Sequence, residues 1–365
     1  MAIQEYKCPN CSGAVSFDSG VQKMKCPYCD AEFEIGALQD CQKEVAEQKP
    51  DVFGWEKYGS QSGTDSIETD ELDALASNSC PSCGAEIIGD KNTVATVCPY
   101  CGNTQIVRER VKDMLKPDFV IPFKLDKKAA KAALVKFQQG KRLLPSLFQS
   151  ESRLDSITAL YVPFWLFDAG ADAQIRYKAT KIATWADSDY TYTRTSFYTV
   201  LRNGALEFQK VPVDGSEKMD DVYMDSIEPF NYAEMVPFNT AYLSGYLAEK
   251  FDVDAEAALP RANERIKKTV EDEFRKTVSG YATVTTESAA VQVPKGTVHY
   301  ALFPVWMLNT KYQGQIYTFA MNGQTGKLIG KLPLDKGKYR KYLFGITAVA
   351  GCILTLVFTL LKNFA

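Results

Sequence analysis

Eight of the ten cysteines in this chain form two copies of one pattern, in which two CxxC pairs are separated by fourteen residues. The second copy lies 72 positions after the first. Each CxxC turn can direct two thiolates at one point, and a short hairpin brings the second turn alongside, which gives the tetrahedral sulfur site that Zn²⁺ favours. The spacing therefore predicts two small β zinc ribbons, at residues 1–36 and 79–108, that hold two Zn²⁺ ions through Cys8, Cys11, Cys26 and Cys29 and through Cys80, Cys83, Cys98 and Cys101.

The residue after each CxxC pair distinguishes the two copies. In the second copy Gly84 and Gly102 can adopt positive φ, which lets backbone N–H groups face the sulfurs. In the first copy Ser12 and Asp30 occupy these positions. Aspartate tolerates the left-handed conformation better than most residues, so we expect a working but less regular first ribbon.

Other uses of CxxC must be compared with zinc binding. Redox dithiols seldom come as two facing pairs, and a disulfide scaffold requires secretion, whereas the first ten residues contain no apolar signal core. Iron of the rubredoxin type uses nearly the same turns, so the ligands alone do not select the metal. Cys41 and Cys352 lack partners at ligand spacing, and we expect them to be unpaired thiols.

The run from Tyr342 to Leu361 has no charged residue. Twenty helical residues rise about 30 Å, which matches the hydrocarbon core of a bilayer. The sequence therefore predicts a transmembrane helix at residues 342–361, although a buried helix of a soluble domain is the alternative. Only Lys362 follows the run. Basic residues crowd its amino-terminal flank, at Lys327, Lys331, Lys336, Lys338, Arg340 and Lys341.

This charge asymmetry predicts the orientation of the chain. By the positive-inside rule the bulk of it stays in the cytosol, as a tail-anchored, single-pass protein of the cytoplasmic membrane. Only residues 362–365 follow the predicted span. The reducing cytosol would also keep the metal-binding thiols free.

Residues 37–78 form an acidic linker between the two predicted ribbons, and residues 114–333 read as an α+β domain. Apolar and polar residues alternate from Ala173 to Ala179, and residues 190–202 are rich in Thr and Tyr, as is typical of strands. Asn203-Gly204 and Asn322-Gly323 match the tight type I′ turn of hairpins, so we expect antiparallel sheet. Helices are predicted at residues 260–278 and 126–139.

Two short echoes suggest an internal duplication of this domain. Residues 120–123 (VIPF) resemble residues 235–238 (MVPF), and residues 161–165 (YVPFW) share Pro and Trp at the same offsets with residues 302–306 (LFPVW). The alternative is that buried edge strands simply begin with proline and bulky apolar residues.

The sequence contains no recognisable catalytic motif. His299 is the single histidine and no nucleophile in a characteristic turn accompanies it. A phosphate loop of the form GxxxxGK followed by Ser or Thr is absent around Gly323 to Lys327. We therefore expect a protein that is not an enzyme.

Charge argues against nucleic acid as the partner. Residues 1–120 contain 11 Lys and Arg against 20 Asp and Glu. Each tetrathiolate zinc site would add about two more negative charges, and binding to phosphates depends on Lys and Arg. Acidic ribbons are better suited to a protein partner.

The chain resembles a family of bacterial membrane proteins labelled TFIIB-type zinc-ribbon proteins. The resemblance covers most of the chain and rests on the twin ribbons, on the terminal span, on PFNTAYLSGY at residues 237–246 and on NGQTGK at residues 322–327. It implies partners of the SPFH type or the phage-shock type. The Ser12 and Asp30 positions depart from the family's CPxCG pattern, which leaves the metal affinity of the first ribbon less well defined.

These features together predict a membrane-anchored zinc-ribbon adaptor that recruits or holds a cytosolic or membrane-associated protein at the bilayer, in a response to envelope stress. The alternative is a membrane-tethered nucleic-acid or transcription-associated zinc-ribbon protein. An enzyme that uses the α+β domain would need a converging polar pocket.

Overall fold

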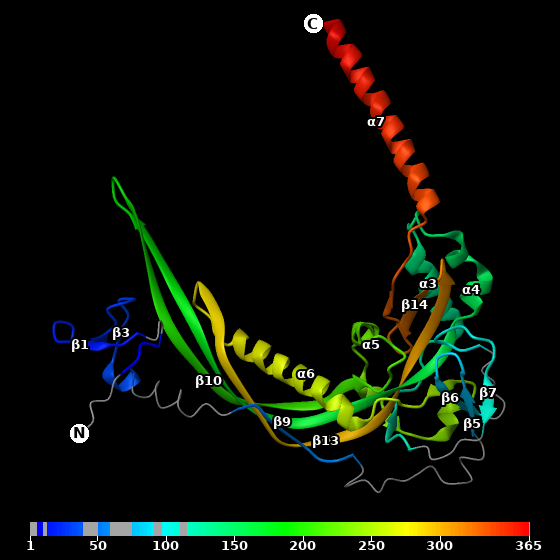
Figure 1. The fold of residues 1–365 in the computed structure, drawn as a ribbon, viewed down its shortest axis with the longest axis horizontal. Helices are drawn as coiled ribbons and strands as arrows, with labels where there is room; N and C mark the ends of the chain where they lie inside the picture. Colours follow the sequence, from blue (N-terminus) through cyan, green and yellow to red (C-terminus); the bar gives the residue numbers. More distant parts are fainter. Residues whose placement is uncertain are drawn as a thin grey trace. The chain divides into compact units, whose positions relative to one another are not determined.

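The computed structural model describes residues 6–9, 13–38, 50–58, 75–90, 97–109 and 115–364 (Figure 1). Cys11, Ser12, Cys41 and most of the predicted linker lie outside the described residues. The chain divides into two compact units. Unit 1 comprises Met1–Ser60, Leu166–Val213 and Glu256–Val298, and unit 2 comprises Gln61–Trp165, Asp214–Ala255 and His299–Ala365. The α+β domain predicted at residues 114–333 thus contributes to both units.

The first cysteine region forms a sheet of its own. Its three strands are β1 (Ser16–Asp18), β2 (Lys23–Lys25) and β3 (Glu32–Phe33), and both pairings are antiparallel. Among the described strands, these three pair only with one another.

The rest of unit 1 is built from long strands and one amphipathic helix. The strands β9 (Thr158–Ala186), β10 (Thr191–Asp214) and β13 (Thr283–Tyr312) each have residues in both units, and β4 (Val52–Trp55) pairs in parallel with β13. Helix α6 (Ala255–Lys276) packs its apolar face against β9 and β13 (Figure 1). The helix predicted at residues 260–278 is confirmed, although it begins five residues earlier and continues through Pro260.

The side chains on this face of α6 recur every four residues, which places them in one stripe. Ala262, Ile266 and Val270 of this stripe are fully buried. Gly280, which follows the end of the helix, adopts a φ of +81°. From Ile266 onward the stripe packs on alternate residues of β9 from Ala169 to Ala179, so the predicted half-buried strand is also confirmed.

The predicted turn at Asn203-Gly204 is wrong. Both residues lie inside β10, and the hairpin turn lies at Asp187–Tyr190, where the Asp187 N–H donates to the Tyr190 carbonyl at 2.9 Å. The glycine serves close packing, because a Cβ on Gly204 would lie 3.2 Å from Cζ of Phe274.

In unit 2 the strands follow the order β11-β8-β13-β9-β12-β6-β5-β7, with β14 beside β13 and β15 beside β14. The strands not yet placed are β5 (Leu75–Ser79), β6 (Glu86–Asp90), β7 (Val107–Glu109), β8 (Phe119–Val120), β11 (Val236–Pro237), β12 (Leu247–Glu249), β14 (Gln315–Asn322) and β15 (Leu328–Gly330). The helices are α3 (Lys127–Gln138), α4 (Glu151–Asp155) and α5 (Asp221–Ile227), and short 3₁₀ turns cover Ser146–Gln149, Tyr232–Glu234 and Thr240–Leu243. The sheet is mixed, because β8–β13 and β9–β12 are parallel and most other pairings are antiparallel.

Local sequence signals explain two of these elements. Asp126 caps α3 by accepting a hydrogen bond from the Ala129 N–H at 2.8 Å, which confirms the predicted helix. The hairpin of β14 and β15 is confirmed as well, but its turn is longer than the predicted two residues: the Asn322 N–H donates to the Lys327 carbonyl at 2.9 Å, and Gly326 carries the positive φ.

Unit 2 contains two pairs of segments that make equivalent contacts. The parallel pairs have matched registers, in which Phe119–Val120 faces Ala301–Leu302 and Leu247–Ala248 faces Leu160–Tyr161. The Pro163 carbonyl accepts from the Gly215 N–H and the Pro304 carbonyl accepts from the Gly323 N–H, both at 2.8 Å. These correspondences support the predicted equivalence of residues 161–165 and 302–306.

The two tryptophans of these segments are also equivalent. Trp165 donates its indole N–H to the Val253 carbonyl at 2.9 Å, and Trp306 donates to the Leu125 carbonyl at 3.0 Å. The Val253 carbonyl lies two residues before α6, and the Leu125 carbonyl lies two residues before α3. Residues 120–126 therefore correspond to residues 248–254. The other echo is different: residues 236–237 form β11, which pairs antiparallel with β8, so residues 235–238 are not the structural equivalent of residues 120–123.

Helix α7 (Lys336–Phe364) contains the predicted span (Figure 1). A 25-residue segment, Lys336–Leu360, is long and apolar enough to cross a membrane, and none of its most apolar window is buried.

Candidate metal centre

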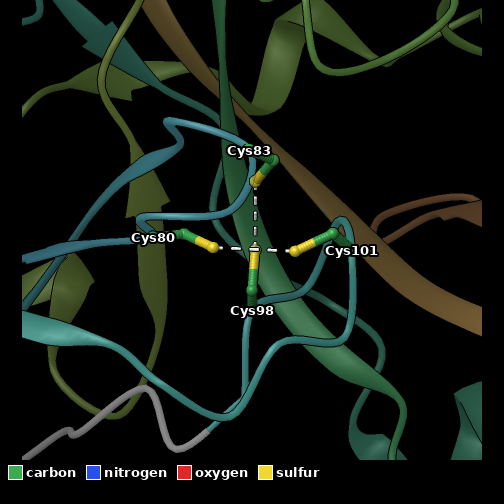
Figure 2. A group of neighbouring side chains, drawn as sticks. All are labelled: Cys80, Cys83, Cys98 and Cys101. Carbon is green, nitrogen blue, oxygen red and sulfur yellow. Dashed lines mark hydrogen bonds between the residues drawn. The ribbon is translucent and has the colours of Figure 1, made fainter.

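The second cysteine cluster brings together all four predicted ligands, Cys80, Cys83, Cys98 and Cys101. Figure 2 shows their sulfurs converging from two loops. The four Sγ atoms lie within 4.8 Å of one another, and the pairs Cys80–Cys101 and Cys83–Cys98 are each 3.6 Å apart. A tetrahedral ion with metal–sulfur bonds of about 2.3 Å requires sulfurs about 3.8 Å apart, so the side chains fit such an ion.

Two matching backbone turns present these sulfurs. The Gly84 N–H donates to the Cys80 carbonyl at 2.8 Å, and the Gly102 N–H donates to the Cys98 carbonyl at 3.0 Å. The glycines have φ of +73° and +72°, as the sequence predicts. Only glycine adopts this conformation without steric cost, which explains its place in both turns.

The thiols of this cluster differ in their tendency to ionise. Burial raises the pKa of Cys80, but backbone N–H groups of Cys83 and Ser82 and the thiols of Cys101 and Cys83 outweigh it and lower the pKa to about 7. Burial raises the pKa of Cys83, and it raises that of Cys98 further. Four adjacent thiolates repel one another, so their joint ionisation needs a cation at the centre.

The second cluster is built into the sheet of unit 2. Strand β6, between its two CxxC turns, pairs antiparallel with β12, with Ile87 opposite Glu249. Tyr100, from the second turn, is buried and donates its hydroxyl to the Glu249 carboxylate, which also accepts from the Ser216 hydroxyl at 2.7 Å. On the other side Asn309 of β13 donates its amide to the Tyr100 carbonyl at 2.8 Å. The cluster is therefore continuous with the surrounding fold.

The first cluster brings together Cys8, Cys26 and Cys29, while Cys11 lies outside the described residues. The Sγ atoms of Cys8 and Cys29 are 3.5 Å apart. Asp30 takes the place of the turn glycine with a φ of +58°, and its N–H donates to the Cys26 carbonyl at 2.9 Å. The expected left-handed aspartate is thus confirmed, and the three described ligands are consistent with a second site.

The equivalent tyrosines of the two clusters have opposite environments. Tyr28 is 74% exposed, whereas Tyr100 is 7% exposed. Phe17, Val21 and Ile35 of the first cluster are each close to half exposed. Val97 and Val107 of the second cluster are exposed to a similar extent, so the clusters differ in the tyrosine: the first presents Tyr28 on its surface, and the second directs Tyr100 into the sheet.

Two other sequence candidates have structural roles. His299, the single histidine, lies beside a backbone contact: the Asp118 N–H donates to the Tyr300 carbonyl at 2.8 Å, the Asp118 carboxylate accepts from the Tyr300 N–H at 2.8 Å, and Nδ1 of His299 lies 4.0 Å from that carboxylate. The NGQTGK motif closes a turn: the Asn322 side chain accepts from the N–H groups of Gln324 and Thr325 at 2.9 Å and donates to the Ile227 carbonyl.

Sequence reasoning missed Tyr100, Glu249, Ser216 and Asn309. The cysteine motif does not distinguish the buried Tyr100 from the exposed Tyr28, because both clusters contain CPYC. Glu249 lies in the short strand LAE, all three residues of which are buried in the structure, and that burial is not visible in the sequence.

The comparisons with known proteins identify one curated relative at high coverage. This chain is 35% identical over 355 residues to the uncharacterized protein YdjG of Bacillus subtilis (strain 168), and the match covers 97% of each chain. No family model matches the chain. No solved structure matches it either.

Proposed function

This chain belongs to the same family as YdjG of Bacillus subtilis, and we propose that it is a membrane-anchored adaptor that holds a cytosolic protein partner at the membrane. The name of this relative states no activity. The proposal therefore rests on the two cysteine clusters and on the distribution of exposed apolar side chains.

Zinc is the metal we assign to both clusters. Four thiolates at tetrahedral spacing suit Zn²⁺, and a closed set of four protein ligands is typical of structural sites. Iron remains an outcome that metal analysis of the purified protein would reveal. When bound, the ion supplies charge neutralisation and cross-links the two turns of each cluster.

The observation that carries the adaptor proposal is the contrast between the clusters. The second is fixed in the sheet through β6 and Tyr100, whereas the first has its own sheet and exposes Phe17 and Tyr28. A large, exposed aromatic side chain such as Tyr28 can supply apolar contact area to a protein partner. We therefore assign the partner-binding role to the first cluster and a structural role to the second.

Helix α7 supplies the anchor in this proposal. Its apolar segment is exposed along its length, and basic residues flank its amino-terminal end, at Lys336, Lys338, Arg340 and Lys341. By the positive-inside rule this flank faces the cytosol, as do the thiols of both clusters.

The experiment is crosslinking in intact cells, followed by purification of the tagged protein from membranes and mass spectrometry. The test variant is Tyr28→Ser, which removes exposed apolar surface without touching a ligand. The matched control is Tyr190→Ser, a tyrosine of unit 1 that is 68% exposed, close to the 74% of Tyr28. We expect an SPFH-type or phage-shock-type protein to be recovered with the wild type and with the control, and to be lost with Tyr28→Ser.

Equal recovery with all three proteins would remove the first cluster from the partner-binding role. Recovery of nucleic acid or polymerase subunits that depends on Tyr28 would replace the adaptor with the nucleic-acid alternative. Recovery of the tagged protein in the soluble fraction would reject the anchor.

A further inference from the structure

A cavity of about 550 Å³ lies where α7 joins the rest of unit 2. Its walls come from residues 140–144, from residues 332–334 and from the first three turns of α7. The volume lies within the range of about 300–1,000 Å³ typical of sites for small molecules. Most of the lining is apolar, and Leu143, Leu334, Leu343 and Ile346 contribute to it.

Hydrogen bonds fix the walls of this cavity. Gly140, with a φ of +74°, ends α3 and turns the chain. The Asp335 N–H donates to the Leu143 carbonyl at 2.8 Å, and the Lys338 ammonium donates to the Leu144 carbonyl at 2.6 Å. Asp335 also caps α7, since its carboxylate accepts from the Gly337 and Lys338 N–H groups at 2.8 and 3.0 Å. The first turn of α7 is therefore attached to the loop after α3.

The rim of the cavity is basic. Lys141 and Arg142 belong to the lining, and no residue of the described lining is acidic. The Lys141 ammonium lies 3.4 Å from the centre of the Phe137 ring, and the Arg142 guanidinium donates to the Tyr342 hydroxyl at 3.4 Å. Arg340 and Lys341, which lie on α7 between the lining residues Tyr339 and Tyr342, add further positive charge.

The apolar side of the cavity continues along α7. A second groove, lined by Gly345, Ile346, Val349 and Ile353 among others, follows the same face of the helix. Tyr342 is the first residue of the uncharged run, and tyrosines gather at the boundary between headgroups and hydrocarbon. The basic rim would then lie at headgroup depth and Leu343 and Ile346 at acyl-chain depth.

We propose that this cavity binds one anionic phospholipid, with its phosphate against Lys141 and Arg142 and an acyl chain along Leu343 and Ile346. The inference rests on the proposed membrane location of α7. A soluble anion would find the basic rim but has no apolar part to fill the cavity, whereas a phospholipid matches both. The occupant is therefore a lipid of the surrounding bilayer.

The test uses the full-length protein in nanodiscs made from equimolar phosphatidylcholine and phosphatidylglycerol. Native mass spectrometry after partial delipidation measures which lipid remains bound. We expect phosphatidylglycerol to be enriched over phosphatidylcholine on the wild type. Each basic residue near an anionic surface is worth about 1 kcal/mol, so K141Q/R142Q should reduce the enrichment about fivefold for each charge removed. The control K128Q/K311Q removes two exposed lysines that are not part of the lining, and we expect no change.

A second variant tests the cavity separately from the charge. Leu334 is half exposed at the cavity wall, and L334W should fill the volume and reduce the retained lipid while the basic rim stays intact. Lipid bound in the same ratio as the bulk bilayer, or an equal loss with K128Q/K311Q, would overturn the inference but not the adaptor. Failure of α7 to insert into the nanodisc would overturn both.

Discussion

The residue after each CxxC pair sets how well a turn presents its sulfurs. Asp30 adopts a φ of +58° where Gly84 and Gly102 serve the second cluster, and the left-handed conformation costs a residue with a Cβ roughly 1 kcal/mol. The ion pair of Asp30 with Lys25, at 3.6 Å, is exposed and contributes little. We expect Asp30→Gly to tighten zinc binding at the first cluster about fivefold.

The reciprocal substitution provides the control. A Cβ at Gly102 would meet no atom within 4 Å, so Gly102→Asp adds backbone strain without a clash and should weaken the second cluster by a similar factor. Competition with a chromophoric chelator measures both affinities. If Asp30→Gly left the first affinity unchanged, backbone strain would not limit that site.

We expect Glu249 to make the stability of unit 2 depend on pH. Burial raises its pKa from 4.5 to about 8 and outweighs the hydrogen bonds from Tyr100 and Ser216, which lower the pKa. A raised pKa means that the folded state holds a proton which the unfolded state releases. The contribution to stability is therefore fully present below pH 4.5 and is lost as the pH rises through about 8, with a slope of at most about 1.4 kcal/mol per pH unit.

Glu249→Gln should flatten this dependence, because the amide stays neutral and can still accept a hydrogen bond. We expect the variant to be more stable than the wild type above pH 8. Chemical denaturation at a series of pH values measures the slope. The same slope in both proteins would assign the pH dependence to other groups.

Residue identity at the ligand positions could be predicted from sequence because metal geometry demands a fixed spacing. The supporting contacts could not, since Glu249 and Asn309 lie about 150 and 210 positions from the Tyr100 they bond. Such pairs depend on the tertiary fold, and a single sequence carries no record of them.

At the element scale, α6 holds unit 1 together through a stripe of apolar side chains. Ile266 is fully buried in the cluster formed by α6, β9 and β13, whereas Lys268 is exposed on the same helix. Ile266→Ala should lower the free energy of unfolding of unit 1 by about 3 kcal/mol, because the lost transfer energy adds to the cost of a cavity. Lys268→Ala should change it by less than about 0.5 kcal/mol. Hydrogen exchange across β10 measures both, and comparable protection in both variants would contradict the assigned packing.

Helices were easier to predict than turns. The apolar period of α6 and the Asp126 cap of α3 are local signals that the tertiary fold preserves. Asn203-Gly204 carries the same local signal as a tight turn, but β10 runs through it because the glycine makes room for Phe274. The glycine at a turn and the glycine under an aromatic ring look alike in a sequence.

At the scale of the whole molecule, the units are discontinuous in sequence, and the linear domains read from composition do not reproduce them. Three strands of more than twenty residues each contribute to both units. A local pattern reports that a segment is extended, but not that β9 and β13 each pass from the core of one unit into that of the other, or that β10 leaves only its last residue in unit 2.

The two cysteine clusters should therefore differ in what their metal stabilises. The second cluster is paired to the sheet of unit 2 through β6 and β12, while the strands of the first pair only with one another among the described strands. Cys80→Ser with Cys83→Ser should destabilise unit 2, and a loss of about 3 kcal/mol would lower the main Tm by about 10 °C. Cys26→Ser with Cys29→Ser removes an equal number of ligands and should leave the main Tm within about 2 °C. Differential scanning calorimetry of the detergent-solubilised protein, with and without a zinc chelator, measures both.

Chelation should reproduce the first result in the wild type and in the Cys26/Cys29 variant. Equal shifts in the two double variants would mean that the first cluster also supports the main fold, and the division into a structural and a partner-binding cluster would then fail.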